Sequence, residues 1–317
     1  MIENKRGIEF GFSWIFAIIA GAVILFSAIY ITTKLISSER KVSDTLVAAE
    51  LDNVLSPIET SLEDSKYSKI KFVDENRVFN ECSTQGVFGK QQISTSSKLG
   101  IGKEWGEKSV RKTSFNKYIF SRTTEEGKEM HAIVKPFVMP FKVADLTILY
   151  GKKYCFVNPP SAIEDELNDL SGNGAQNISI IINSTLSGCP QNADSVCFDQ
   201  LGCTIRVNTQ GKVVSKYGVD LYYEGDSLEL AAIFADPEIY ECQVKRLTKR
   251  AGELGAVYAR KATYLGGSGC SNNLVQDLQS FVLASNINNS REFVQVIVPL
   301  AQALEERNGN IAKCKVF

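Results

Sequence analysis

The sequence contains one long uncharged stretch, FGFSWIFAIIAGAVILFSAIYITT, which runs from Phe10 to Thr33. At 1.5 Å per residue, a helix of this length spans about 36 Å, and the hydrocarbon core of a bilayer is about 30 Å thick. Half of the residues are Ile, Leu, Val or Phe, each of which favours insertion by about 0.3–0.6 kcal/mol near the bilayer centre. Because a buried helix of a globular protein rarely runs this far without a charge, the stretch predicts a transmembrane helix at 10–33.

The two ends of the stretch indicate an anchor that is retained. Trp14 and Tyr30 stand where aromatic side chains gather at membrane interfaces. The apolar run is longer than the 7–15 residues of a cleaved secretory signal, and no small-x-small cleavage site precedes the charges that follow it. We therefore expect residues 1–9 to form a short cytoplasmic segment.

Three small residues within the stretch, Ser13, Ala17 and Gly21, are spaced by four. This spacing lets two helices approach closely in lipid, although it also arises by chance. The lipid bilayer is the expected partner, and the spacing adds a second copy of the chain or another membrane or surface protein as candidates.

Basic residues do not decide the orientation of the anchor, because Lys5 and Arg6 precede it and Lys34, Arg40 and Lys41 follow it. The cysteines do decide it. All eight follow the anchor and none forms a CxxC pair: Cys82, Cys155, Cys189, Cys197, Cys203, Cys242, Cys270 and Cys314. One histidine cannot complete several zinc sites, and so many thiols would be unusual in a reducing compartment.

The eight cysteines are therefore read as disulfides, with eight buried thiols as the alternative. Of the 105 possible connectivities, we expect Cys197–Cys203 across a short hairpin and Cys270–Cys314 around the last helices. Closing a loop of the second size would stabilise the fold by about 4 kcal/mol. The body of the protein is then expected outside the cytoplasm, with the chain crossing the cell membrane once.

Beyond the anchor the apolar pattern changes three times. Residues 34–63 repeat apolar positions near every 3.6 residues and predict an amphipathic stalk helix, which Pro57 would kink. Residues 64–235 alternate in short runs and predict a β-rich ectodomain with antiparallel strands, a short helix near 161–172 and further strands over 195–235. Asp236 suits an N-cap and Pro237 suits the first helical position, so residues 236–317 are predicted to be a helical part. The expected fold class is α+β.

Composition excludes some functions. Lys and Arg number 35 against 36 Asp and Glu, so the chain is not a broadly basic nucleic-acid binder. No cofactor or metal site is predicted. The phosphate-loop motif fails because Glu107 stands where its second glycine belongs, and Ser-x-x-Lys matches at Ser38, Ser68 and Ser109 lack companion motifs.

Two further groups of residues have ordinary explanations. His131 could act as a general base, but no nucleophile motif accompanies it, so a structural histidine is expected. The acidic residues of 164–169 could bind calcium, but carboxylates also stabilise a first helical turn. No catalytic residue is predicted.

Six cations lie along the helix expected after Asp236: Lys245, Arg246, Lys249, Arg250, Arg260 and Lys261. They could meet an anionic partner such as a surface polymer or lipid head groups. An ordinary solvated helix face is the other interpretation, and the one we expect.

The start of the chain, Lys5-Arg6-Gly7 followed at once by the apolar run, resembles the class III signal of type IV pilin-like proteins. That resemblance implies cleavage between Gly7 and Ile8 and packing of the apolar helix in a filament. The family usually has glutamate at the fifth mature position, where this chain has Phe12.

The whole chain also resembles a group of uncharacterised archaeal single-pass membrane proteins. The resemblance is carried by the stretches KPFVMPFKVAD (135–145), YCFVNPP (154–160) and FADPEIYEC (234–242). It implies placement in the membrane and no particular activity. We therefore expect an anchored cell-surface protein with a structural or interaction role, such as a pilin-like subunit or a component of a surface complex. An anchored exported enzyme or ligand-binding module is the alternative.

Overall fold

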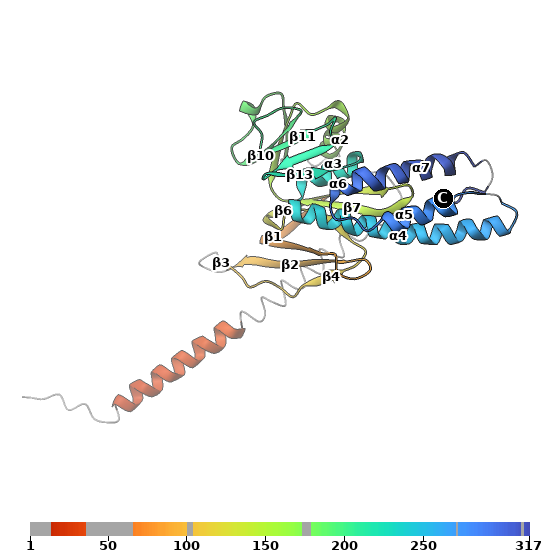
Figure 1. Ribbon diagram of the computed structural model, residues 1–317. Helices are drawn as coiled ribbons and strands as arrows, with labels where there is room; N and C mark the ends of the chain where they lie inside the picture. The colour runs from red at the N-terminus through yellow and green to blue at the C-terminus, as the bar shows by residue number, and fades with distance from the viewer. Residues whose placement is uncertain (1–13, 36–65, 100–103, 173–178, 271, 312–313) are drawn as a thin grey trace, which may run out of the picture.

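The computed structural model describes residues 14–35, 66–99, 104–172, 179–270, 272–311 and 314–317 (Figure 1). Its first element is a helix, Trp14–Leu35, with a mean hydropathy of 2.5 over its most apolar window. None of that window is buried against the rest of the protein. The expected α+β class and the expected N-terminal apolar helix are both confirmed. The proposed cleavage site at Gly7 and Ile8, Ser13 and stalk residues 36–63 lie outside the described residues.

Seven strands form the first sheet, in the order β3-β2-β1-β6-β7-β5 with β4 beside β2. Most neighbours are antiparallel, as expected, but β5 and β7 run in parallel. The long strands β1 and β6 carry the centre of the sheet. The strands are β1 (Lys66–Ser83), β2 (Lys90–Leu99), β3 (Glu104–Trp105), β4 (Lys112–Ser114), β5 (Tyr118–Phe120), β6 (Thr124–Val138) and β7 (Lys142–Tyr150).

The second sheet has six strands, in the order β13-β12-β11-β10-β8-β9. Only β11, β12 and β13 are antiparallel; β8 pairs in parallel with β9 and β10, and β10 with β11. Helix α2 (Ser161–Gly172) provides the crossover that parallel β8 and β9 require. The prediction of an antiparallel region is therefore wrong here, because apolar alternation does not report strand direction. The strands are β8 (Lys153–Val157), β9 (Ile180–Asn183), β10 (Ala193–Phe198), β11 (Ile205–Asn208), β12 (Val213–Lys216) and β13 (Val219–Tyr222).

Helix α3 (Gly225–Phe234) lies where further strands were expected, so that part of the prediction is wrong. Its residues from Leu228 to Phe234 are all buried. A short helix buried on every side has the same continuous apolar run as a buried strand, and periodicity cannot separate the two. Only the packing of the folded chain shows that this segment is a helix.

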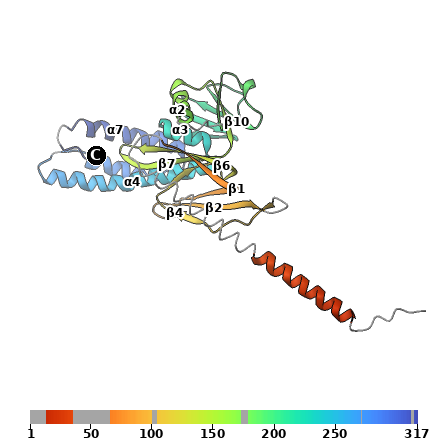
Figure 2. The ribbon, with the colours of Figure 1, turned by 180° about the vertical axis from the view of Figure 1, so that it is seen from behind.

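The longest helix is α4 (Pro237–Gly267), which begins with Asp236 as N-cap and Pro237 in its first turn. Helices α4, α5 and α7 lie side by side and extend past the first sheet (Figure 1, Figure 2). One continuous core joins them to both sheets. The remaining helical elements are η1 (Leu186–Gly188), α5 (Val275–Ala284), α6 (Ser290–Glu292), the π-helical turn η2 (Phe293–Ile297) and α7 (Val298–Gly309).

All eight cysteines form disulfides: Cys82–Cys242, Cys155–Cys189, Cys197–Cys203 and Cys270–Cys314. The two pairings expected from sequence are among them. The expected hairpin at Cys197–Cys203 is wrong, however, because β10 and β11 run in the same direction. The tight connection between these strands instead needs positive φ angles at Asp199 (52°) and Gly202 (105°).

Candidate functional site

His131 lies buried in β6, where both of its ring nitrogens have hydrogen-bonding partners. Nδ1 lies 2.5 Å from the Tyr67 hydroxyl and Nε2 lies 2.9 Å from the Ser179 hydroxyl, while Tyr150 stacks on the ring. Burial, aided by the charge of Lys69, lowers the pKa of His131 to about 4. Such a weak base would activate the Ser179 hydroxyl poorly near neutral pH. The geometry is that of a structural histidine.

The other sequence motifs are also explained by packing. The Ser109 hydroxyl accepts a hydrogen bond of 2.8 Å from the Thr95 N–H, which ties this serine to β2. Glu166, one of the acids on α2, forms a largely buried ion pair of 2.6 Å with Lys135. Among the residues that the structure describes, no group of three His, Cys, Asp or Glu could hold a metal ion.

The cations of α4 differ in exposure, and Arg246 does not lie on the solvated face that was expected. Arg246 is 1% exposed and donates from Nε to Phe88 O, from Nη1 to Lys117 O and from Nη2 to Phe115 O, at 2.9–3.1 Å. Lys249 donates to Gly86 O and Arg250 to Val143 O. Further along α4, Lys261 donates to Val316 O.

These bonds have one physical reason. Loop carbonyls that face the body of the protein need donors once they lose water, and long basic side chains on a neighbouring helix supply them. The expectation of a solvated face is therefore wrong for Arg246, which is buried, whereas Arg260 and Lys261 are exposed. Sequence analysis could not reveal this, because nothing in the order of residues shows which helix face meets the loops.

An amide network continues from Arg246 into the first sheet. Arg246 Nη1 donates to Gln243 Oε1 at 2.7 Å, and Gln243 Nε2 donates to Gln91 Oε1 and to Ile119 O. Gln91 in turn donates to Asn80. These buried groups join α4 to β1, β2 and β5 while satisfying one another.

A second polar cluster lies where the two sheets meet. Arg122 pairs with Asp194 of β10, and Asp236 accepts hydrogen bonds of 2.8 and 2.9 Å from the Thr123 N–H and hydroxyl. Asp236 thus binds the turn before β6 instead of capping its own helix with its side chain. The cluster fastens the first turn of α4 to both sheets.

Two buried groups of this cluster have strongly shifted pKa values. Burial raises the pKa of Glu125 to about 7, although the Gly151 N–H and Arg122 act in the opposite direction. Burial lowers the pKa of Lys216 to about 7, and its Nζ donates to the carbonyls of Ile233 and Ala235. Shifted pKa values often mark functional sites, but both of these side chains are shut away from solvent and hydrogen-bonded inside. The arrangement is suited to holding the sheets together.

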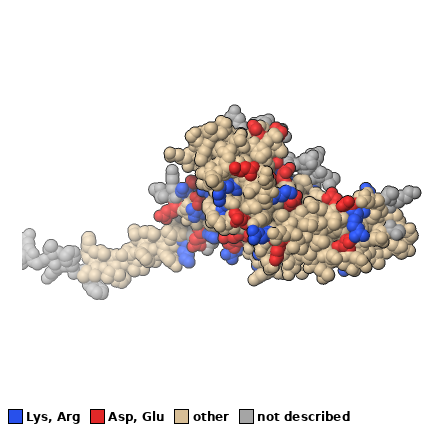
Figure 3. Space-filling model, turned by 45° about the horizontal axis from the view of Figure 1, so that its top comes forward, with Lys and Arg blue, Asp and Glu red and all other residues tan. Residues whose placement is uncertain are grey.

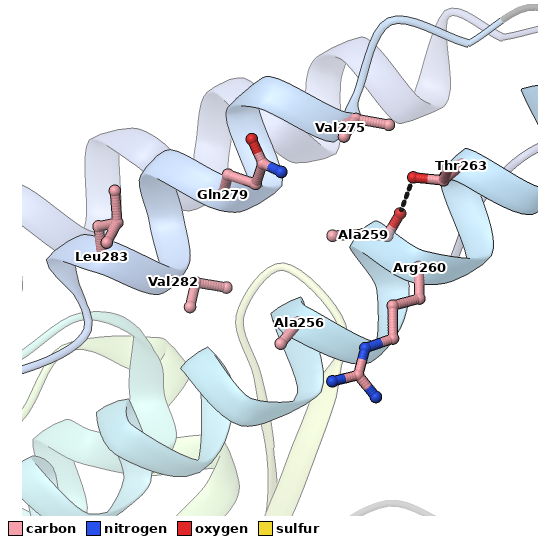
Figure 4. Close-up of a pocket in the computed structure, with 8 residues that line it drawn as sticks. All are labelled: Ala256, Ala259, Arg260, Thr263, Val275, Gln279, Val282 and Leu283. Carbon is pink, nitrogen blue, oxygen red and sulfur yellow. Dashed lines mark hydrogen bonds between the residues drawn. The ribbon is translucent and has the colours of Figure 1, made fainter.

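An open groove of about 420 Å³ runs between α4 and α5 (Figure 4). Its lining is mostly apolar, and it is formed by Ala256, Ala259, Arg260, Thr263, Val275, Gln279, Val282 and Leu283. The Thr263 hydroxyl donates to Ala259 O at 3.0 Å and is thereby turned along its own helix. Ligand sites are commonly concave, mostly apolar and of this size, so the groove is the candidate binding site on the described surface.

The charged side chains are unevenly distributed. In the view of Figure 3, Lys, Arg, Asp and Glu gather near the middle of the molecule and at one place on the helical part, while much of the remaining surface is uncharged. Ala17 and Gly21, two of the three residues in the candidate helix-packing face, are exposed on the helix Trp14–Leu35. No family model, no curated protein and no solved structure matches this chain.

Proposed function

We propose that the protein is anchored in a membrane by one helix and acts by contact with other molecules, not by catalysis. The observation that carries the proposal is the helix Trp14–Leu35, which is apolar throughout its centre and buried against nothing in the protein. At 1.5 Å per residue its 22 residues span about 33 Å, enough for a hydrocarbon core. Ile24, Leu25 and Phe26 expose most of their surface. Soluble monomers rarely expose a continuous apolar surface of this kind to water.

The disulfides support a body on the oxidising side of that membrane. Four disulfides use all eight cysteines, and such bonds form and persist outside the reducing cytosol. Residues 1–9 would then remain inside. We infer a cell-surface role, either as a pilin-like subunit or as a component of a surface complex.

Fractionation and protection of intact cells test the placement. Carbonate-washed membranes should retain the full chain, and protease added outside should digest the body. Thiol labelling without reductant should find no free cysteine. Recovery of the chain in the soluble fraction, or a protected body, would contradict the proposal.

A charged pair in the anchor provides the sharpest variant. Ile24→Lys/Leu25→Lys places two charges near the helix centre, at a cost of about 2.5–3.5 kcal/mol each for insertion. The protein should then leave the membrane fraction. Leu201→Lys is the matched control, because Leu201 is an exposed apolar residue of the body.

The pilin-like interpretation has its own test. The mass of the mature protein should show loss of residues 1–7 if cleavage follows Gly7, and surface material should contain filaments under the electron microscope. An intact N-terminus with no filaments would leave a role in a surface complex.

A ligand-binding module is a second candidate, favoured by the groove between α4 and α5. Its lining suits a small apolar molecule. Binding of an apolar fluorescent dye to the full chain should weaken in Ala256→Phe, which fills the groove, and should be unaffected in Leu201→Phe. Equal binding by both variants would exclude the groove.

A further inference from the structure

Two neighbouring loops at one end of the first sheet expose apolar side chains. Val87 and Phe88, between β1 and β2, are 58% and 39% exposed, and Phe115, which follows β4, is 60% exposed. Gln91 of β2 pairs with Ser114 of β4, so the two loops leave the same pair of strands side by side. We refer to Val87, Phe88 and Phe115 as the apolar tip.

Arg246 holds the backbone of the apolar tip in place. Its guanidinium binds Phe88 O at 3.1 Å and Phe115 O at 3.0 Å, which brings the two phenylalanine backbones together. Lys249 binds Gly86 O at 2.7 Å in the same loop. The carbonyls are drawn toward α4 while the side chains remain in solvent, so ordering of the loops costs little when the tip meets a partner.

Glycine at position 89 is needed for this arrangement. Its φ of +59° is one that other residues rarely adopt, and a Cβ there would collide with Ser83 O and with the Arg246 side chain. The loop therefore has a defined shape, and that shape keeps Val87 and Phe88 exposed.

Basic residues lie close to the apolar tip. Lys90 opens β2, Lys112 opens β4 directly after Arg111, and Lys249 reaches the loop from α4. Arg111 is paired with Glu81 of β1, so Lys90, Lys112 and Lys249 are the cations that could meet an anionic surface. Apolar side chains rimmed by lysine and arginine fit a surface that is apolar beneath and anionic above, which is the structure of a bilayer with anionic lipids.

We propose that the apolar tip docks on the anionic surface of the same membrane that the helix Trp14–Leu35 spans. This inference rests on the proposed function, because the anchor keeps the bilayer permanently near the tip. Residues 36–65 link the helix to β1, and thirty residues reach about 45 Å as a helix and about 100 Å extended. The linker joins β1 at Lys66, and the tip follows the other end of this strand at Ser83, so the tip meets the bilayer when β1 lies along the membrane.

Quenching of tryptophan by brominated acyl chains tests the contact in the full chain reconstituted into vesicles of phosphatidylcholine and phosphatidylglycerol. Trp105→Phe removes the native indole of the body and serves as background. In that background, the indole introduced by Phe115→Trp should be quenched, and the one introduced by Leu201→Trp should not. Leu201 is 80% exposed and lies on the second sheet's disulfide loop, away from the tip.

Charge reversal tests the role of the lysines. A lysine near an anionic surface strengthens association about fivefold, so Lys90→Glu and Lys112→Glu should each weaken the docked state by about that factor or more. In vesicles of phosphatidylcholine alone, which carry no net charge, the Phe115→Trp variant should be quenched less than in vesicles that contain phosphatidylglycerol.

Trp14 is present in every variant and reports the anchor separately. If Trp14 is quenched but Phe115→Trp is quenched no more than Leu201→Trp, the tip does not dock and the surface serves another partner, such as a protein. If Trp14 itself is not quenched, the anchor fails and the proposed function fails with it. Circular dichroism spectra that match wild type, together with a thiol assay that finds no free cysteine, show that each variant is folded.

Discussion

The two halves of α4 both carry basic side chains, but the protein holds them differently. In the first half, Pro237–Ala251, Arg246 donates hydrogen bonds to three loop carbonyls, and Cys242 forms a disulfide with Cys82 of β1. In the second half, Gly252–Gly267, Lys261 donates to Val316 O, but Arg260 is exposed and makes no ion pair with another described residue. The contacts with α5 are mainly apolar. The first half faces the sheet and the second half extends past it.

This difference shows how the surroundings decide what a cation does. Buried carbonyls that have lost water hold the Arg246 guanidinium inside the protein, whereas the Arg260 guanidinium remains in solvent. The first half is therefore a structural spine, and the second half contributes the surface with the open groove.

The largest effect is expected from removal of Cys82–Cys242, which closes a 160-residue separation. By the entropy of loop closure, Cys82→Ala/Cys242→Ala should lower the free energy of unfolding by about 5 kcal/mol. Cys270→Ala/Cys314→Ala, with a 44-residue separation, should cost about 4 kcal/mol. Chemical denaturation in detergent measures both.

Hydrogen exchange locates the two effects. Loss of Cys270–Cys314 should increase exchange only in the second half of α4 and in the tail, and loss of Cys82–Cys242 should increase it in the first half. The same exchange pattern in both variants would mean that the halves are not distinct.

Arg246→Met should be the next most damaging change. Four oxygen acceptors lose their donor, and an unpaired buried acceptor costs about 1–3 kcal/mol, so a loss of about 3 kcal/mol or more is expected. Arg260→Met in the second half should change stability by less than about 0.5 kcal/mol. Urea unfolding of the two variants compares the halves directly, and equal losses would contradict the comparison.

Glu125 makes the anchoring of the first half sensitive to pH. Its folded-state pKa of about 7 lies above the ordinary value of 4.5, so folding favours the protonated carboxyl. The resulting stabilisation is complete below about pH 4.5 and is lost as the pH rises through 7. Relative to wild type, Glu125→Gln should therefore gain about 3 kcal/mol between these limits.

The comparison must be made as a difference between variant and wild type across pH. Lys216 and His131 have lowered folded-state pKa values, so their contributions to stability rise with pH, opposite to that of Glu125. Because both groups are present in wild type and variant, their contributions cancel in the difference. A difference that does not change with pH would show that the Glu125 carboxyl is ionised in the folded protein throughout.

The smallest effect concerns how closely α4 and α5 approach in the second half. A Cβ at Gly252 would lie 2.6 Å from Ser285 Cβ, and Ser285 is held by its bond to Phe281 O, so Gly252→Ala should cost about 1–3 kcal/mol. At Gly255 the nearest side-chain atoms are 3.2 Å away and belong to Phe281 and Val282. Gly255→Ala should be nearly neutral, because helix propensity offsets the contact. Thermal unfolding ranks the two, and the reverse order would contradict this packing.

Several features could be predicted from particular residues. The uncharged run predicted the helix Trp14–Leu35, the even count of cysteines predicted disulfides, and Asp236-Pro237 predicted where α4 begins. Each is a local or compositional signal. The prediction of a solvated side chain failed for Arg246, because its partners are carbonyls more than 100 positions away in the chain.

Strand direction and the apolar tip show the same limit. Alternation predicted the strands near Cys155 and Cys197, but not that β8 and β10 are parallel, because both directions bury the same side chains. Nothing in the sequence marks Phe88 and Phe115 as neighbours until Arg246 is placed between their carbonyls.

Amino-acid order alone is sufficient to predict the apolar helix and the pairing of the cysteines, since hydropathy over one helix and the number of thiols need no knowledge of neighbours. Pairing of the sheets, the pKa of Glu125, the use of the α4 cations and the exposure of the apolar tip arise only in the folded chain. The physical reason is that burial and hydrogen bonding depend on which distant groups displace water from one another.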